Sequence, residues 1–292
     1  MRMNGEAYLE RLGDRDLAFL AEVSGGVRTA AEGVARLRAE PDQIPALIER
    51  PKVFDALFAP WAGSPFLVAG PFLTFSVLLA ATARELERTS FVSERVGPRR
   101  RVPVFDVGDL RDFVDDPLRR VFLAELLASY TRIASGSVWV NGRRGWARRR
   151  FSELDPVRLA ELAHAVQDAD RPAVYRRLGD LTLFLSGVFP DYAEGRLFRP
   201  VQIERLQRLV LVPGGEGGSP GEEPGGAIGL LERLGRSSYR LASSGAADPS
   251  GGLPRVLRDL VDRFGQARRV LAVLTERYLY PRREEWFPAG GH

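Results

Sequence analysis

The residues best suited to chemistry at a surface are arginines and tryptophans gathered in one short segment. Five arginines fall within eight positions, and two tryptophans lie among or close to them. Guanidinium groups pair with phosphate oxygens and indole rings stack on unpaired bases, so the segment indicates a surface for single-stranded nucleic acid. The alternative is that the arginines pair with acidic helices while Trp139 anchors the segment to the core. The residues concerned are Trp139, Arg143, Arg144, Trp146, Arg148, Arg149 and Arg150.

Two acids stand out because their neighbours in the sequence are apolar. Asp180 follows Gly179 and precedes the apolar run 181–188, and Glu125 is the only charged residue between positions 121 and 131. A carboxylate in such surroundings either serves as a buried base or accepts hydrogen bonds from an arginine or a helix end. We expect the structural role, and an enzyme with an unfamiliar site near Asp180 stays open as an alternative.

Several classes of site are excluded by residue counts. The chain has no cysteine and only two histidines, which excludes disulfides, thiol nucleophiles, cysteine-based zinc sites and three-histidine metal sites. Glu161 and His164 have the spacing of a di-iron ligand pair, but the second such pair that a di-iron bundle needs is missing. No phosphate-binding loop or dinucleotide fingerprint is present. We therefore predict no catalytic residue, no cofactor and no metal, and favour a protein that is not an enzyme.

Composition places the chain among ordinary globular proteins. It has 292 residues, 45% of them hydrophobic and 27% charged, with a net charge of +4. Every basic residue except Lys52 is arginine, and this arginine-rich usage indicates a GC-rich bacterial genome. Four acids within positions 1–21 do not fit a signal peptide, so we expect a soluble, cytoplasmic protein.

The uncharged segment 56–83 is the main candidate for membrane contact. Its length would suffice to cross a bilayer, but Pro60, Pro65 and Pro71 interrupt the first half. The segment from 72 to 88 therefore predicts a buried core helix, and we do not expect membrane contact.

The remaining pattern predicts a mainly α protein, an irregular multi-helix bundle with one small β-hairpin. Apolar residues at helical spacing indicate helices throughout, and Asp116-Pro117 and Asp155-Pro156 are typical helix starts. Gly and Pro within 89–109 indicate an irregular surface connection. Residues 138–151 predict the hairpin, with Asn141-Gly142 as its turn.

Three parts follow from the distribution of Gly, Pro and Ser. Residues 1–212 are predicted to form a helical core domain that includes the hairpin. Residues 213–226 contain no large apolar side chain and predict a flexible linker. Residues 227–292 are expected to form C-terminal helices that pack back on the core.

One segment resembles a signature found in a group of uncharacterised bacterial proteins. The signature is a Gly-Asp pair followed by Leu-Phe, Gly, an aromatic residue and Pro, and here it runs from Gly179 to Pro190. A downstream pattern of Gly235, Ser238-Tyr239 and Ala242 is also similar to that group. The resemblance covers about residues 118–287 and implies a soluble helical fold, with no function attached. Histidine often precedes the Gly-Asp pair in that group, so its absence here means that no histidine-dependent chemistry is implied.

These observations favour a non-catalytic binding or regulatory module that acts through contacts with a protein partner. Binding of single-stranded nucleic acid through the hairpin is the main alternative.

Overall fold

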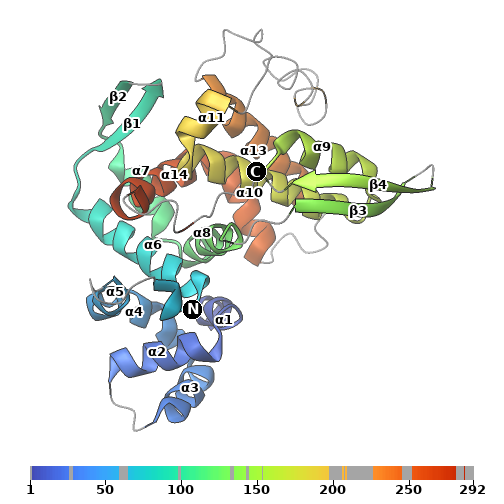
Figure 1. Cartoon of the computed structure of the whole chain (residues 1–292). Helices are drawn as coiled ribbons and strands as arrows, with labels where there is room; N and C mark the ends of the chain where they lie inside the picture. The colour runs from blue at the N-terminus through green and yellow to red at the C-terminus, as the bar shows by residue number, and fades with distance from the viewer. Residues whose placement is uncertain are drawn as a thin grey trace. The chain divides into compact units, whose positions relative to one another are not determined.

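The computed structural model of the protein describes residues 2–25, 29–58, 65–97, 100–131, 135–142, 145–152, 154–196, 206, 208, 226–244, 252–280 and 286. Over these residues the fold is mainly α-helical, which confirms the predicted class, and the strands form two separate antiparallel pairs (Figure 1). The chain divides into two compact units. The first contains Met1–Ser90, Val107–Arg132 and Glu276–Ala289, and the second contains Phe91–Asp106, Ile133–Thr275 and Gly290–His292.

The first unit is helical throughout its described residues. Its elements are α1 (Arg2–Leu9), α2 (Asp14–Ser24), α3 (Ala30–Ala39), η1 (Pro41–Gln43), α4 (Ile44–Ile48), α5 (Pro51–Phe58), η2 (Pro65–Leu67), α6 (Pro71–Arg88), α7 (Val107–Val114), α8 (Pro117–Ser129) and most of the π-helical segment η3 (Thr275–Leu279).

Helix α6 is the buried helix that the uncharged segment predicts. It begins at Pro71, and its side chains from Phe72 to Ala83 are all buried. The hydroxyls of Ser76 and Thr82 donate to carbonyl oxygens one turn earlier, at 2.8 and 2.9 Å, so these buried polar groups are satisfied. None of the described helices is both long and apolar enough to cross a membrane.

A buried acid joins the starts of two helices in the first unit. The Asp16 carboxylate accepts hydrogen bonds from the backbone N–H of Gly13, at 3.2 Å, and of Gly70, at 2.6 Å. Gly13 and Gly70 immediately precede α2 and α6. Backbone N–H groups at the start of a helix have no acceptor within that helix, and Asp16 supplies one. A Cβ at position 70 would lie 3.0 Å from an Asp16 oxygen, so glycine allows this close approach.

The second unit combines two β-hairpins with long helices. Its elements are β1 (Val92–Gly97), β2 (Arg100–Val104), β3 (Ser135–Gly142), β4 (Gly145–Ser152), α9 (Pro156–Ala165), α10 (Arg171–Val188), α11 (Pro190–Arg196), α13 (Gly226–Ser244) and α14 (Gly252–Leu274).

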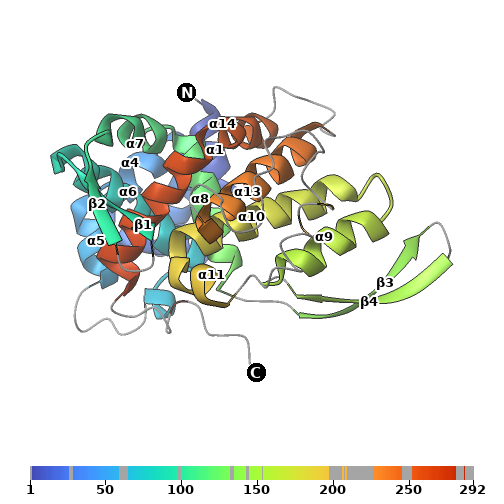
Figure 2. The ribbon, with the colours of Figure 1, turned by 90° about the horizontal axis from the view of Figure 1, so that it is seen from above.

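Helix α10 forms the core of the second unit. Every residue from Leu178 to Val188 is buried, because α9, α13 and α14 pack around it. In Figure 2, α10 and α13 lie side by side, with α14 next to α13. The C-terminal helices α13 and α14 therefore pack on α10.

The structure bears differently on three of the sequence predictions. The irregular connection predicted within 89–109 contains the hairpin β1–β2, because residues 92–97 pair with residues 100–104. The predicted division of the chain at 212 and 227 stays a prediction. The predicted linker at 213–226 lies outside the described residues, apart from Gly226.

Candidate interaction surfaces

The hairpin β1–β2 has two faces of different character. Its register pairs Val92 with Val104 and Glu94 with Val102, and these residues lie on one face because side chains alternate along a strand. On this face Val92 is buried and Glu94 is partly buried. We call the opposite side the outer face; its positions within the strands are Ser93, Arg95, Arg101 and Pro103, and Phe91 and Phe105 adjoin the strands at the base of the hairpin.

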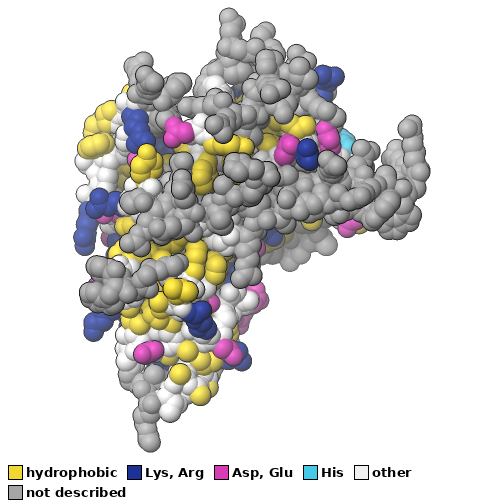
Figure 3. Space-filling view, viewed as in Figure 1, with side chains coloured by type: hydrophobic (Ala, Val, Ile, Leu, Met, Phe, Trp, Pro, Cys, Tyr) yellow, Lys and Arg dark blue, Asp and Glu magenta, His cyan; other side chains and the backbone are white. Residues whose placement is uncertain are grey.

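An exposed aromatic pair lies at the base of the outer face. Phe91 and Phe105 flank the Val92–Val104 pair, and their ring centroids are 5.8 Å apart. Phe91 is 48% exposed and Phe105 is 72% exposed. Hydrophobic side chains accordingly gather at the surface over this hairpin in Figure 3. A single exposed apolar residue needs no explanation, whereas two contacting phenylalanines form an apolar patch.

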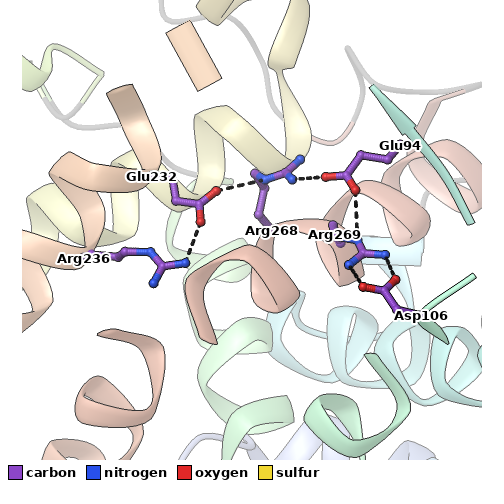
Figure 4. Close-up of polar contacts among 6 residues, drawn as sticks. All are labelled: Glu94, Asp106, Glu232, Arg236, Arg268 and Arg269. Carbon is purple, nitrogen blue, oxygen red and sulfur yellow. Dashed lines mark hydrogen bonds and ion pairs between the residues drawn. The ribbon is translucent and has the colours of Figure 1, made fainter. Parts of the chain in front are cut away.

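The inner side of the hairpin is attached to the helices by a chain of ion pairs. Arg269 donates to both carboxylate oxygens of Asp106, and its Nε lies 3.5 Å from Glu94 Oε2. Arg268 donates to Glu94, and its Nε lies 3.8 Å from Glu232 Oε2. This ion-pair chain, drawn in Figure 4, runs through Arg236, Glu232, Arg268, Glu94, Arg269 and Asp106.

Burial makes this pairing energetically important. The side chains of Arg268 and Arg269 are only 11% and 12% exposed. A charge removed from water in this way is costly unless an opposite charge and hydrogen bonds compensate for it. Glu94 lies between the two arginines and pairs with both. The β1–β2 hairpin is therefore held to α14 by ion pairs. Removing one partner would leave a buried charge uncompensated.

Asp106 carries an electrostatic signature of this contact. The hydrogen bond from Arg269 is the largest influence and lowers the pKa of Asp106; burial opposes it, and the positive charge of Arg269 lowers the pKa further. A lowered carboxyl pKa means that the charged form is favoured in the folded protein. The contact is therefore complete at neutral pH and weakens as the pH falls through the pKa of Asp106.

The other end of the ion-pair chain covers an irregularity in α14. The backbone of Arg263 leaves the helical region, with φ −110° and ψ 27°. Arg236 donates to the carbonyl oxygens of Val261 and Asp262, at 3.2 and 3.4 Å, and also to Glu232 at 2.7 Å. A break in a helix leaves carbonyl groups in need of donors, and Arg236 supplies them.

The second hairpin, β3–β4, carries the arginine and tryptophan residues singled out by the sequence. Its register pairs Trp139 with Arg148, Asn141 with Trp146 and Ser137 with Arg150. These positions share one face, because they are separated by two residues along each strand. Arg149 pairs with Val138 on the opposite face. Arg143 and Arg144 lie outside the described residues.

The turn of this hairpin is not where the sequence predicts it. Asn141 and Gly142 belong to β3, and the last pair of the ladder is Gly142 with Gly145. A ladder sets the register of a hairpin together with its turn. Here the ladder extends to Gly142 opposite Gly145, so the local preference of Asn-Gly for a turn does not decide the register.

Asp180 is buried among α10, α13 and α14. Its carboxylate accepts a hydrogen bond from the Tyr239 hydroxyl at 3.0 Å, and Arg176 Nε lies 3.7 Å from its other oxygen. A Cβ at position 179 would lie 2.6 Å from the Tyr239 ring, so Gly179 makes room for the tyrosine. The two signature segments therefore meet in the core. Gly179 leaves room for the Tyr239 ring, and the Tyr239 hydroxyl donates a hydrogen bond to Asp180.

The other predicted acid pairs within the first unit. Glu125 in α8 accepts a hydrogen bond from Arg11 Nε at 2.6 Å, and its side chain is about one-third exposed. Glu161 and His164 lie on α9. Among the described residues, no three His, Asp or Glu side chains lie close enough to hold a metal ion.

The sequence analysis missed the β1–β2 hairpin and its attachment. One signal was present: Phe91-Val92 and Val104-Phe105 are placed symmetrically about position 98 in the sequence. No such signal marks the arginines, because Arg268 is 174 residues from Glu94 and Arg269 is 163 residues from Asp106.

Comparisons with protein-family models, curated proteins and solved structures found no match to the chain.

Proposed function

We propose that this protein is a non-catalytic binding module of the bacterial cytoplasm that acts through contacts with a protein partner at the outer face of β1–β2. The exposed Phe91–Phe105 pair is the observation on which the proposal depends. Aromatic residues are enriched in protein interfaces, and a few of them supply most of the binding energy.

The attachment of the hairpin supports this proposal. An isolated two-stranded hairpin is marginally stable in water. Here Glu94 and Asp106 pair with Arg268 and Arg269, so the base of the hairpin, next to Phe91 and Phe105, is held in place before a partner arrives. A pre-ordered surface loses less conformational entropy on binding, and more of the energy of apolar burial appears as affinity.

The contacts of the two candidate acids also favour a binding role. Asp180 accepts a hydrogen bond from Tyr239, and Glu125 accepts one from Arg11. The first contact joins α10 to α13 and the second joins α8 to the turn after α1, which is a structural role for a carboxylate.

Capture of partners from a lysate of the native organism tests the proposal. We compare the wild-type protein, the double variant Phe91→Ala/Phe105→Ala, and Tyr192→Ala as a control. Tyr192 is an exposed aromatic of the same unit, 44% exposed, that does not belong to the hairpin. The double variant should lose about 2 kcal/mol of binding energy, or roughly 30-fold in affinity, while the control keeps its partner. Equal capture by all three proteins would refute the proposal.

Binding of single-stranded nucleic acid by β3–β4 is a second candidate, supported by the register. Trp139, Trp146, Arg148 and Arg150 share one face of this hairpin. A strip that combines aromatic and basic residues offers both stacking and phosphate contacts. Arg149 lies on the opposite face and provides an internal control.

Titration of a labelled 20-nucleotide oligothymidylate at two salt concentrations tests this second candidate. Trp146→Ala should cost about 1–3 kcal/mol if a base stacks on the indole. Neutralising Arg148 and Arg150 should flatten the salt dependence of binding, because fewer counterions are then released. Arg149→Gln should have a smaller effect. Absence of binding at low salt would eliminate this candidate.

A further inference from the structure

We propose that the ion-pair chain couples the docking of β1–β2 on α14 to the irregular backbone within α14. The inference goes beyond the proposed function, because it concerns two parts of the second unit and needs no partner. The coupling passes through Glu232, whose carboxylate pairs with both Arg236 and Arg268 (Figure 4). Loosening of the hairpin then loosens the helix, and loosening of the helix loosens the hairpin.

The irregular backbone divides α14 into two segments. Arg263 has φ −110° and ψ 27°, outside the helical region, and we call this point the break. Gly265 follows two residues later, and glycine weakens the interior of a helix. Backbone hydrogen bonds near the break are therefore sensitive to the side chains of other helices that contact it.

Two side chains of α13 contact both segments. Arg236 donates to the carbonyl oxygens of Val261 and Asp262, at the end of the first segment. Glu232, one turn earlier in α13, accepts a hydrogen bond from Arg236 at 2.7 Å. Its other carboxylate oxygen lies 3.8 Å from Nε of Arg268, which belongs to the second segment. One ion pair of α13 therefore spans the break.

Arg268 connects this ion pair to the hairpin. Its side chain is only 11% exposed and donates a hydrogen bond to Glu94 of β1. Its Nε is buried and makes no hydrogen bond within the described part of the chain. The 3.8 Å from this Nε to Glu232 is an ion-pair distance, too long for a hydrogen bond. Glu94 is thus the hydrogen-bonding acid of Arg268 while the hairpin is docked, and Glu232 is a second acid within reach.

This arrangement makes undocking of the hairpin felt at the break. If Glu94 withdraws, the buried Arg268 guanidinium needs another acid, because an uncompensated buried charge is costly. Glu232 can move the short distance onto Arg268, at the expense of its contact with Arg236. Arg236 then loses the carboxylate that holds it over the carbonyl groups of the first segment.

The same competition runs in the other direction. Without Arg236, the Glu232 carboxylate is free to bond Arg268 and to compete with Glu94 for it. A coupling free energy between two sites is reciprocal, so a change at the break must affect the hairpin as much as a change at the hairpin affects the break.

The core confines the coupling to a local opening. Leu260 lies before the break, and Phe264 and Leu271 lie after it; all three are fully buried. The Phe264 ring also packs against Tyr239, with their centroids 6.1 Å apart. Both segments of α14 are therefore fixed in the core, and we expect faster opening of backbone hydrogen bonds at the break without a large movement of the helix.

Hydrogen exchange of the full-length protein, followed by mass spectrometry, tests the first direction. Glu94→Gln should make amides of residues 260–267 exchange about three- to tenfold faster, although Glu94 pairs with α14 beyond this stretch, at Arg268 and Arg269. Asp168→Asn is the control, because Asp168 pairs with Arg171 elsewhere in the same unit. The control should leave 260–267 unchanged. Unchanged exchange there in Glu94→Gln would overturn the proposal.

The second direction has a closely matched control. Arg236→Gln should make amides of β1 and β2 exchange faster by a similar factor, because Glu232 is released toward Arg268. Arg240→Gln removes the same charge from the same helix, one turn later and at an exposed position, and should leave the hairpin unchanged. Equal exchange of the hairpin in the two variants would refute the coupling.

Removal of the shared carboxylate tests the route. In a Glu232→Gln background, adding Glu94→Gln should change exchange at 260–267 by less than about twofold, because the connecting acid is gone. A full effect in this background would refute the role of Glu232. Amides of α10 report general destabilisation in every variant. Acceleration of α10 to the same extent as 260–267 would attribute the effect to loss of overall stability and also count against the proposal.

Discussion

Replacement of Gly179 by alanine should destabilise the second unit, although alanine is the better helix former. A Cβ at this position would lie 2.6, 2.7 and 3.0 Å from three carbons of the Tyr239 ring. The ring is fully buried, and its centroid is 6.1 Å from that of Phe264, so it has little room to move away. Any movement also displaces the Tyr239 hydroxyl from the Asp180 carboxylate.

The magnitude follows from three opposing contributions. Inserting a methyl group into a packed core costs about 1–3 kcal/mol. Loss of a hydrogen bond to a charged acceptor costs about 1.5–3 kcal/mol. The higher helix propensity of alanine returns about 1 kcal/mol. The three contributions together span about 1.5–5 kcal/mol, and we expect a net loss near the middle of this range, about 2–4 kcal/mol, in the unfolding free energy of the second unit.

Hydrogen exchange of the full-length protein, followed by mass spectrometry, measures this loss locally. Amides of α10 and α13 should exchange roughly 30- to 1,000-fold faster, since each 1.36 kcal/mol changes the opening equilibrium about tenfold. Gly108→Ala is the control, because a Cβ at that position meets no atom within 4 Å. It should leave protection unchanged or slightly higher. Unchanged or greater protection of α10 and α13 in Gly179→Ala would refute the close packing of Tyr239 against position 179.

Three further changes test other contacts. Tyr239→Phe should lower the stability of the second unit by about 1–3 kcal/mol, measured by exchange in α10, because Asp180 loses a buried donor; no loss would show that this hydrogen bond is unimportant. Asp16→Ala should lower the protection of α6 by about 2 kcal/mol, because backbone donors at the starts of α2 and α6 lose their acceptor, and unchanged protection would contradict that role. An NMR titration of the Asp106 carboxyl carbon should give a midpoint below the ordinary aspartate pKa of about 3.9. Arg269→Gln should raise this midpoint, because the hydrogen bond and the charge of Arg269 lower the pKa of Asp106. The resulting loss of stability, as the pH falls below about 4, should stay under about 1 kcal/mol since Asp106 is half exposed; an identical midpoint in the variant would contradict the contact.

Helix boundaries were predictable where the signal is local. Asp116 and Asp155 precede prolines, and each carboxylate accepts hydrogen bonds from the two backbone N–H groups that follow the proline. Asp170 precedes α10 in a similar way but makes no capping hydrogen bond. Its backbone is already helical, with φ −90° and ψ −16°, whereas a capping side chain needs an extended backbone.

Strand pairing was less predictable. The β3–β4 hairpin follows from alternating residues and turn chemistry, yet its register depends on the whole ladder. The β1–β2 hairpin was missed because arginines and a Gly-Pro turn also fit an exposed loop. The hairpin is held to α14 by contacts such as that of Glu94 with Arg268, which are far apart in the sequence.

The amino-acid sequence by itself determined the mainly α fold, the buried helix α6, the helix starts at Asp116 and Asp155, and the presence of β3–β4. These features depend on apolar periodicity and on hydrogen bonds between residues close in the chain. Only the tertiary structure decided that Gly179 admits Tyr239 and that Glu94 and Asp106 pair with arginines more than 160 residues away. Such contacts depend on which helices pack together, and the sequence pattern of one segment does not contain that information.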